Sequence, residues 1–104
     1  MNKADLVAAV AETSGLSRKD AESAIAAFQY EVIKAITEGD DIRLTGFGTF
    51  SQVTREAHTA RNPRTGEAIP VAARKAPKFT AGAQFKDVVR GVATLESAKE
   101  RLVK

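Results

Sequence analysis

Residues 39–50 read GDDIRLTGFGTF, and the character of the chain changes within this stretch. Ile42 and Leu44 alternate with polar residues, which predicts a short, half-buried strand. The glycines on either side of Phe47 predict a turn, and a second strand is expected to start at Thr49. Before this stretch apolar residues recur at helical spacing, and after it the pattern is typical of strands and turns. We therefore predict an α+β fold.

Two helices are predicted upstream, in residues 1–39. Asn2–Asp5 and Ser17–Asp20 are helix-capping patterns, and each opens a run of apolar residues at helical spacing. Gly15 and Gly39 are placed to end these runs. We therefore expect a helical hairpin whose small, alanine-rich apolar face is suited to close packing.

Downstream, residues 41–82 are expected to form a three-stranded antiparallel sheet with one long hairpin, the arm. Residues 53–77 are polar, basic and rich in small side chains, and residues 61–66, RNPRTG, predict the turn at its tip. About ten residues on each side, at about 3.3 Å per residue, would place the tip roughly 30 Å from its base. Ile69 and Val71 are too few bulky apolar side chains to bury both faces of this ribbon.

A short helix is predicted for residues 83–92, because Phe85, Val88 and Val92 recur at helical spacing. Residues 1–92 are expected to form one domain. Residues 93–104 are a C-terminal extension for which both a further helix and disorder remain open.

Composition limits the class of protein. The 104 residues are 43% apolar and 28% charged, as in a globular domain. No apolar run could span a bilayer and no signal peptide is recognisable, so we expect a cytoplasmic protein without a membrane partner. The sequence has no cysteine, a single histidine and no recognisable catalytic motif, so neither an enzyme nor a metal or other cofactor is expected.

The basic residues are concentrated in the strand region. Residues 1–40 carry four basic and seven acidic side chains, a net charge of −3, whereas residues 41–90 carry nine and four, a net charge of +5. This asymmetry is typical of a protein with a polyanionic partner, and the alternative is a basic surface that only aids solubility.

All phenylalanines of the chain lie outside the arm. Without the arm roughly 80 residues remain, which is near the size at which a single core becomes marginal. We therefore predict that these rings form a common core or a dimer interface, the alternative being an ordinary monomer core. They are Phe28, Phe47, Phe50, Phe79 and Phe85.

Four blocks occur in order along the chain: MNKADL at 1–6, GDDIRLTGFGTF at 39–50, RNPRTGE at 61–67, and PKFTAG with FKD between residues 77 and 87. In these blocks the chain resembles the HU and integration host factor family of bacterial histone-like DNA-bending proteins, and HU in particular. The resemblance implies an intertwined dimer with a helical base, a sheet saddle and two β-ribbon arms that enter the minor groove of DNA.

The resemblance also implies which residues contact DNA. Basic side chains on the saddle and arms would neutralise phosphates without requiring a particular sequence. The proline at the arm tip would wedge between base pairs and kink the duplex, as minor-groove architectural proteins of this family do; its alternative role is that of a simple turn former. The implied residues are Lys3, Arg55, His58, Arg61, Asn62, Pro63, Arg64, Arg74, Lys75, Lys78 and Lys86.

The chain departs from the family pattern at several of these positions. The family often has arginine at His58, glycine at Ala60, and lysine at Thr80 and Ala83, so this saddle and arm root carry less positive charge. His58 has three alternative roles: a simple exposed side chain, a hydrogen-bond donor that faces the groove, or a switch that titrates. Residues 69–74 are more similar to integration host factor than to most HU arms.

Three functions follow from these observations. The first is an architectural function, in which the protein binds double-stranded DNA with little sequence specificity and prefers bent, nicked or gapped DNA. Binding of this kind would bend the DNA and compact the nucleoid. The second is site-selective bending of the integration-host-factor type, read through DNA deformability. The third is a protein-interaction module whose basic arm binds acidic partners. A homodimer is expected, with a heterodimer with a paralogue as the alternative.

Overall fold

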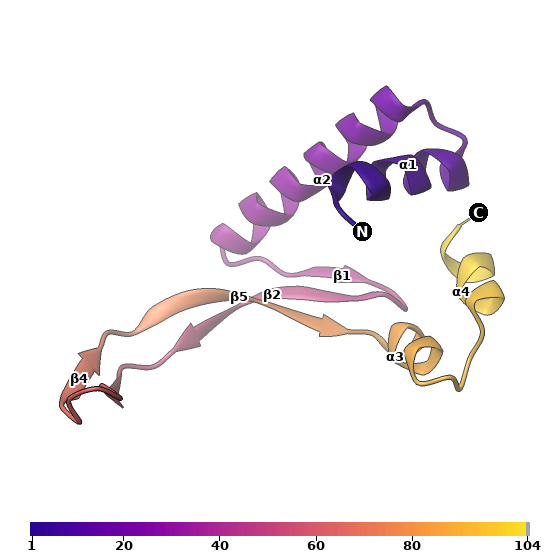
Figure 1. Ribbon diagram of the computed structural model, residues 1–104. Coiled ribbons are helices and arrows are strands. Elements are labelled where there is room, and N and C mark those ends of the chain that lie inside the picture. The colour runs from indigo at the N-terminus through magenta and orange to yellow at the C-terminus, as the bar shows by residue number, and fades with distance from the viewer. Residues whose placement is uncertain (104) are drawn as a thin grey trace.

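A computed structural model describes residues 1–103 as a helix pair, antiparallel strands and two short helices (Figure 1). The elements are α1 (Lys3–Ser14), α2 (Arg18–Thr37), β1 (Ile42–Leu44), β2 (Gly48–Arg55), β3 (His58–Arg61), β4 (Ala68–Val71), β5 (Arg74–Ala81), α3 (Ala83–Val89) and α4 (Leu95–Leu102). The helix pair lies over one face of the sheet, and the arm projects away from both. The predicted α+β architecture is confirmed.

Both predicted helix caps are present. The Asn2 side chain accepts a hydrogen bond from the Asp5 backbone N–H (2.9 Å), and the Asn2 N–H donates to the Asp5 carboxylate (3.1 Å). The Ser17 hydroxyl accepts from the Asp20 N–H (3.1 Å) at the start of α2. These side chains satisfy N–H groups that have no partner within their helix, so α1 and α2 begin where the sequence predicts.

The core of the described chain is small. Among residues 1–103 the only buried hydrophobic side chains are Val7, Ala11, Ala21 and Ile36. The first three pack together where α1 meets α2, and none of the buried side chains is aromatic. A core of this size gives little hydrophobic stabilisation to a chain of 104 residues.

The three-stranded sheet has the order β1-β2-β5 and is antiparallel throughout. Phe50 on β2 lies opposite Ile42 on β1 and Phe79 on β5, so the three side chains share one face. The Gln52 amide, on the same face, donates a hydrogen bond to the Ile36 carbonyl of α2 (2.9 Å). This face of the sheet is therefore turned toward the helix pair.

Glycine allows α3 to start against the β1–β2 turn. The Gly82 N–H donates to the Phe47 carbonyl (2.8 Å), and the Phe85 N–H donates to the Gly46 carbonyl (3.2 Å). A Cβ on Gly82 would lie 2.8 Å from the Gly46 carbonyl, closer than packed atoms allow. At the other side of the turn, β2 starts at Gly48, one residue earlier than predicted.

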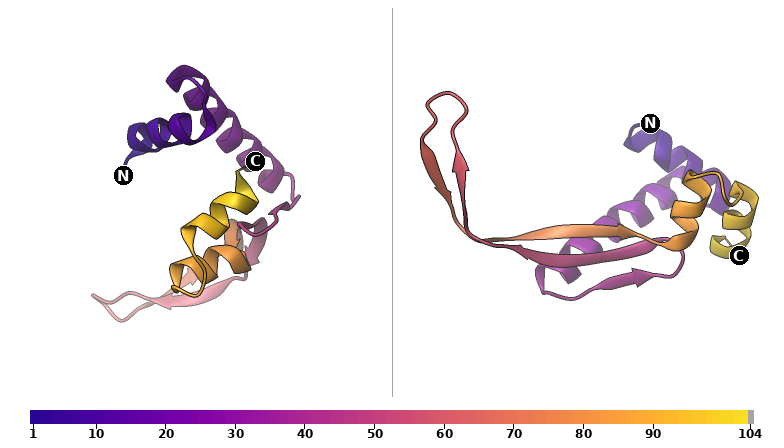
Figure 2. Two further views of the ribbon diagram at one scale, coloured as in Figure 1. Left: turned by 90° about the vertical axis from the view of Figure 1, so that its right-hand side faces the viewer. Right: turned by 90° about the horizontal axis from the view of Figure 1, so that it is seen from below.

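The arm consists of two paired sections instead of the single continuous hairpin that the sequence predicted. The β2–β5 section ends at the pair Arg55 and Arg74, and the β3–β4 section continues in the same register. Residues 56–57 and 72–73 between them belong to no strand, and there the ribbon bends (Figure 2, right). Three of these four residues are alanines, which provide no bulky cross-strand pair to keep the ladder straight.

The C-terminal region also differs from the predicted helix over residues 83–92. α3 ends at Val89, because Gly91 adopts a left-handed conformation (φ +81°) that stops the helix. A separate helix, α4, follows, and the Thr94 hydroxyl accepts from the Ser97 N–H (3.1 Å) at its start. No helix described in residues 1–103 is long and apolar enough to cross a membrane.

Candidate nucleic-acid interface

Basic side chains gather on the face of the sheet that is turned away from the helices. Because successive residues of a strand point to opposite faces, Arg55 points away from the side occupied by Phe50. Arg74 lies directly opposite Arg55, and Lys78 belongs to the same alternate set along β5. All three basic residues are exposed.

The pairing register adds one residue to this face and removes another. Arg43 on β1 is exposed and lies opposite Thr49, so it belongs to the basic face, although the sequence analysis did not select it. Lys75 falls on the other face, where it lines an apolar hollow with Ile33 and Ile36 of α2. We define the basic face as Arg43, Arg55, Arg74 and Lys78.

The basic face has no internal charge compensation. Arg55 and Arg74 are like charges directly opposite one another, an arrangement that destabilises a sheet unless a counter-charge is present. Among the residues that the structure describes, the one ion pair joins Arg90 to Asp87 (3.0 Å), both on or next to α3. The basic face therefore has the electrostatic character of a binding site for a polyanion.

The arm tip is an ordered loop built around Asn62. The Asn62 N–H donates to the Glu67 carbonyl (2.9 Å), and the Gly66 N–H donates to the Asn62 carbonyl (2.8 Å). The Asn62 side chain accepts from the Arg64 N–H (2.9 Å). These bonds make Asn62 an organiser of the turn, and they leave Pro63 exposed at its corner.

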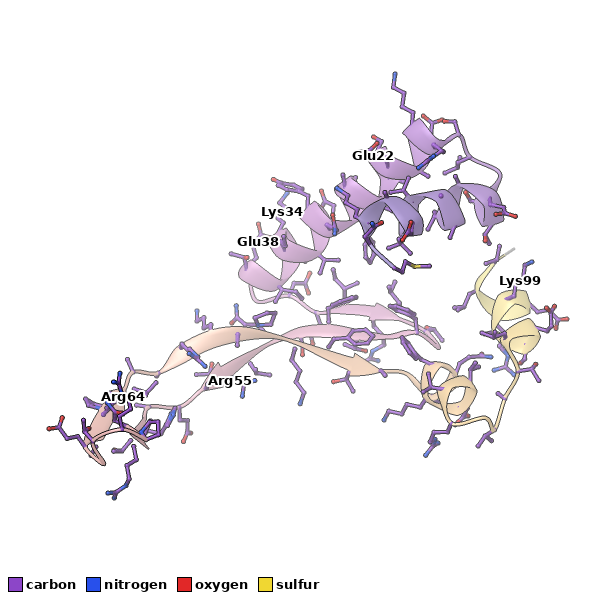
Figure 3. All side chains as sticks on the ribbon, viewed as in Figure 1. Glu22, Lys34, Glu38, Arg55, Arg64 and Lys99 are labelled. Atoms are coloured by element: carbon purple, nitrogen blue, oxygen red, sulfur yellow. The ribbon has the colours of Figure 1, made fainter. Side chains whose placement is uncertain are left out.

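Two arginines flank the exposed proline. The Arg61 guanidinium donates to the Gly66 carbonyl (3.1 Å) across the loop, while Arg64 lies at the end of the arm. Figure 3 shows Arg64 on the arm, whereas the acidic Glu22 lies on α2 above the sheet, and Glu38 directly follows α2 at its end nearer the arm.

The remaining candidates lie apart from the basic face. Lys3 is the first residue of α1 and Lys86 lies in α3, and both are exposed. His58 begins β3 and is also exposed; its Nδ1 lies 3.3 Å from the Glu56 carbonyl. In residues 1–103 no group of three histidine or acidic side chains is placed to hold a metal ion.

The phenylalanines form one cluster, but it is open to solvent. The Phe79 ring centroid lies 4.8 Å from that of Phe50, 5.5 Å from Phe47 and 6.3 Å from Phe85, and Phe28 lies 6.3 Å from Phe50. Phe28, Phe79 and Phe85 are 47%, 41% and 39% exposed. None of these rings is buried, whereas an ordinary monomer core would bury them.

Comparisons with known proteins agree with this geometry. The family described as Bacterial DNA-binding protein matches residues 1–90. DNA-binding protein HRm of Rhizobium meliloti is 52% identical over 89 residues, 86% of this chain and 99% of that protein. DNA-binding protein HU of Geobacillus stearothermophilus is 47% identical over 90 residues, 86% and 100% of the two chains. A cocrystal structure of Anabaena HU with DNA has a TM-score of 0.80 at 39% identity, covering 86% of this chain and 97% of that one.

The chain therefore belongs to the bacterial DNA-binding protein family, and within it to the HU type. This assignment confirms the resemblance seen in the sequence and makes the chain a DNA-binding protein and not an enzyme.

Proposed function

We propose that the chain is an architectural protein that binds double-stranded DNA with little sequence preference and bends and compacts it in the bacterial nucleoid. The observations that carry this proposal are the uncompensated basic face and the two exposed arginines at the arm tip, Arg61 and Arg64. Phosphates would supply the missing counter-charges, and release of condensed cations would favour binding at any sequence. Phosphate contacts position a protein on DNA without reading its bases.

The proposed binding unit is a homodimer. One chain exposes 8328 Å², whereas a compact monomer of this mass would expose about 5,700 Å². The excess is about 2,600 Å² for one chain. Obligate dimers bury about 2,000 to 5,000 Å² in total over both chains. A second copy that covers the phenylalanine cluster would complete the core and provide the second arm.

Pro63 is proposed as the group that bends the duplex. It is exposed, it carries no N–H, and the hydrogen bonds of Asn62 hold the loop that presents it. An apolar, rigid side chain delivered into the minor groove can separate two stacked base pairs and kink the helix. Two arms would introduce two such kinks at one bound dimer.

The function is tested by titrating the purified chain with a set of unrelated duplexes of equal length at about 50 mM salt, where phosphate contacts are strong. We expect all of them to bind with affinities within about threefold of one another, as nonspecific phosphate contacts require. Strong preference for a few duplexes would favour a site-selective bender, with specificity read from deformability. Failure to bind any duplex would favour a protein-interaction module.

Arg61→Ala is expected to weaken binding to every duplex and to flatten the salt dependence. Loss of one phosphate contact reduces the slope of log affinity against log salt by about one unit. Lys34→Ala is the matched control, because it removes one positive charge from α2, away from the arm (Figure 3). An unchanged slope for Arg61→Ala would mean that this side chain only holds the Gly66 carbonyl and touches no phosphate.

A further inference from the structure

α4 lies outside the region that this chain shares with its HRm and HU relatives. The family match ends at residue 90, and the HRm and HU relatives have almost no length left beyond their matched residues. Leu95, Ala98 and Leu102 recur on one side of α4, at helical spacing. The Gln84 amide of α3 donates a hydrogen bond to the Ser97 hydroxyl of α4 (3.4 Å), and this bond links the two helices.

The apolar side of α4 faces a hollow that the single chain does not fill. This hollow has a volume of about 200 Å³, and its lining includes Phe47, Phe85, Val88, Leu95, Ala98 and Leu102. Leu95 is 76% exposed and Leu102 is 49% exposed although both belong to the lining. An apolar surface left open in this way is typical of an interface.

The hollow is continuous with the phenylalanine cluster. Phe47 and Phe85 belong to both, and their ring centroids are 5.4 Å apart. Beyond α4, Val103 lines a second hollow together with Ala9 and Val10 of α1. α4 and the following residue therefore stand at one end of the space between the helix pair and the sheet (Figures 1 and 2).

We propose that α4 is part of the interface between two copies of this chain, with the helix pair of the partner seated on the Leu95–Ala98–Leu102 side. The inference rests on the proposed homodimer and adds an element that the shorter HU relatives lack. A molecule that covers Phe47 and Phe85 from the open side also reaches α4, because these rings line both features. The consequence is a larger shared core than residues 1–90 alone can form.

A second copy fits this surface better than an unrelated protein does. The helix pair has its own uncovered apolar side chains, which include Leu6, Phe28, Tyr30 and Ile33. In a two-fold dimer one surface of each copy meets a complementary surface of the other, so both sets become covered together. The side of α4 away from these apolar residues carries the exposed, charged Glu96 and Glu100, which suit solvent. A paralogue that ends near residue 90 would leave half of this surface open, so the extension favours the homodimer.

The first test compares two double variants of the full chain by sedimentation over a dilution series. Leu95→Ser with Leu102→Ser removes the apolar side of α4, and Glu96→Ser with Glu100→Ser changes its charged side. We expect the dimer dissociation constant to rise at least about tenfold for the leucine variant and less than about threefold for the control, since only the leucines bury apolar area. Equal dissociation constants for the two variants and the unaltered chain would overturn the proposal.

The second test uses the unaltered chain, so it does not depend on the folding of a variant. Isotopically labelled and unlabelled chains are mixed and exchanged, and filtered nuclear Overhauser effects are recorded from the methyl groups of Leu95 and Leu102. We expect contacts to protons of the other chain. A dimer in which these methyl groups contact only their own chain would contradict the role of α4 alone. A chain that sediments as a monomer at every concentration would contradict the homodimer as well.

Discussion

Replacing Phe79 with alanine is expected to dissociate the dimer. In a single chain Phe79 is 41% exposed, yet its ring is at the centre of the cluster with Phe47, Phe50 and Phe85. If a second copy covers the cluster, each truncation removes a buried ring at a cost of about 3–5 kcal/mol, and the dimer contains two of them. Sedimentation and urea unfolding at several protein concentrations measure this loss.

Ile69→Ala is the matched control for this experiment. Ile69 is 43% exposed, close to the value for Phe79, but it lies on β4 of the arm. Without a partner both truncations would remove half-exposed side chains, and neither loss would depend on the protein concentration. An effect of Phe79→Ala no larger than that of Ile69→Ala would show that the cluster remains open to solvent and would refute the shared core.

Pro63→Ala is expected to abolish most of the DNA bend while leaving much of the affinity for straight duplex. The hydrogen bonds that Asn62 makes with Gly66, Glu67 and Arg64 do not involve the proline ring, so the loop should persist. Alanine is too small and too flexible to hold a base step open, whereas the phosphate contacts of the basic face are unaltered. Energy transfer between dyes at the two duplex ends measures the bend.

Pro70→Ala separates the wedge from a general effect of proline on the arm. Pro70 lies in β4, opposite Thr59 and away from the tip. We expect this variant to bend DNA as the unaltered chain does, and only Pro63→Ala to lose its preference for gapped over intact duplex. Unchanged energy transfer in Pro63→Ala would exclude Pro63 as the wedge, and equal losses in both variants would indicate a need for arm stiffness instead.

The elements of this fold that depend on local sequence could be predicted, because their signals lie within a few residues. Asn2 with Asp5 and Ser17 with Asp20 determine where two helices start, and the structure contains both caps. The break in the arm could not be predicted in the same way. A run of polar and small residues fits a continuous ribbon and a bent one equally well, and only the pairing pattern separates them.

Which residues form the basic face could be determined only from the register of the strands. Alternation along β5 shows that Lys75 and Lys78 point to opposite sides, but the sequence alone does not show which side faces the helices. The hydrogen bond from Gln52 to Ile36 and the pairing of Phe50 with Phe79 decide this. Arg43 is assigned by the same register, through a strand of only three residues.

Equilibrium binding of the purified chain to one intact random duplex and to the same duplex with a gap tests the central claim most directly. It should be measured at about 50 and 200 mM salt, with the stoichiometry determined at saturation. We expect binding of both duplexes by two chains per site, tighter binding of the gapped one, and a steep loss of affinity at the higher salt concentration. Absence of binding to either duplex at the lower salt concentration would contradict the assignment of the basic face as a DNA-binding surface.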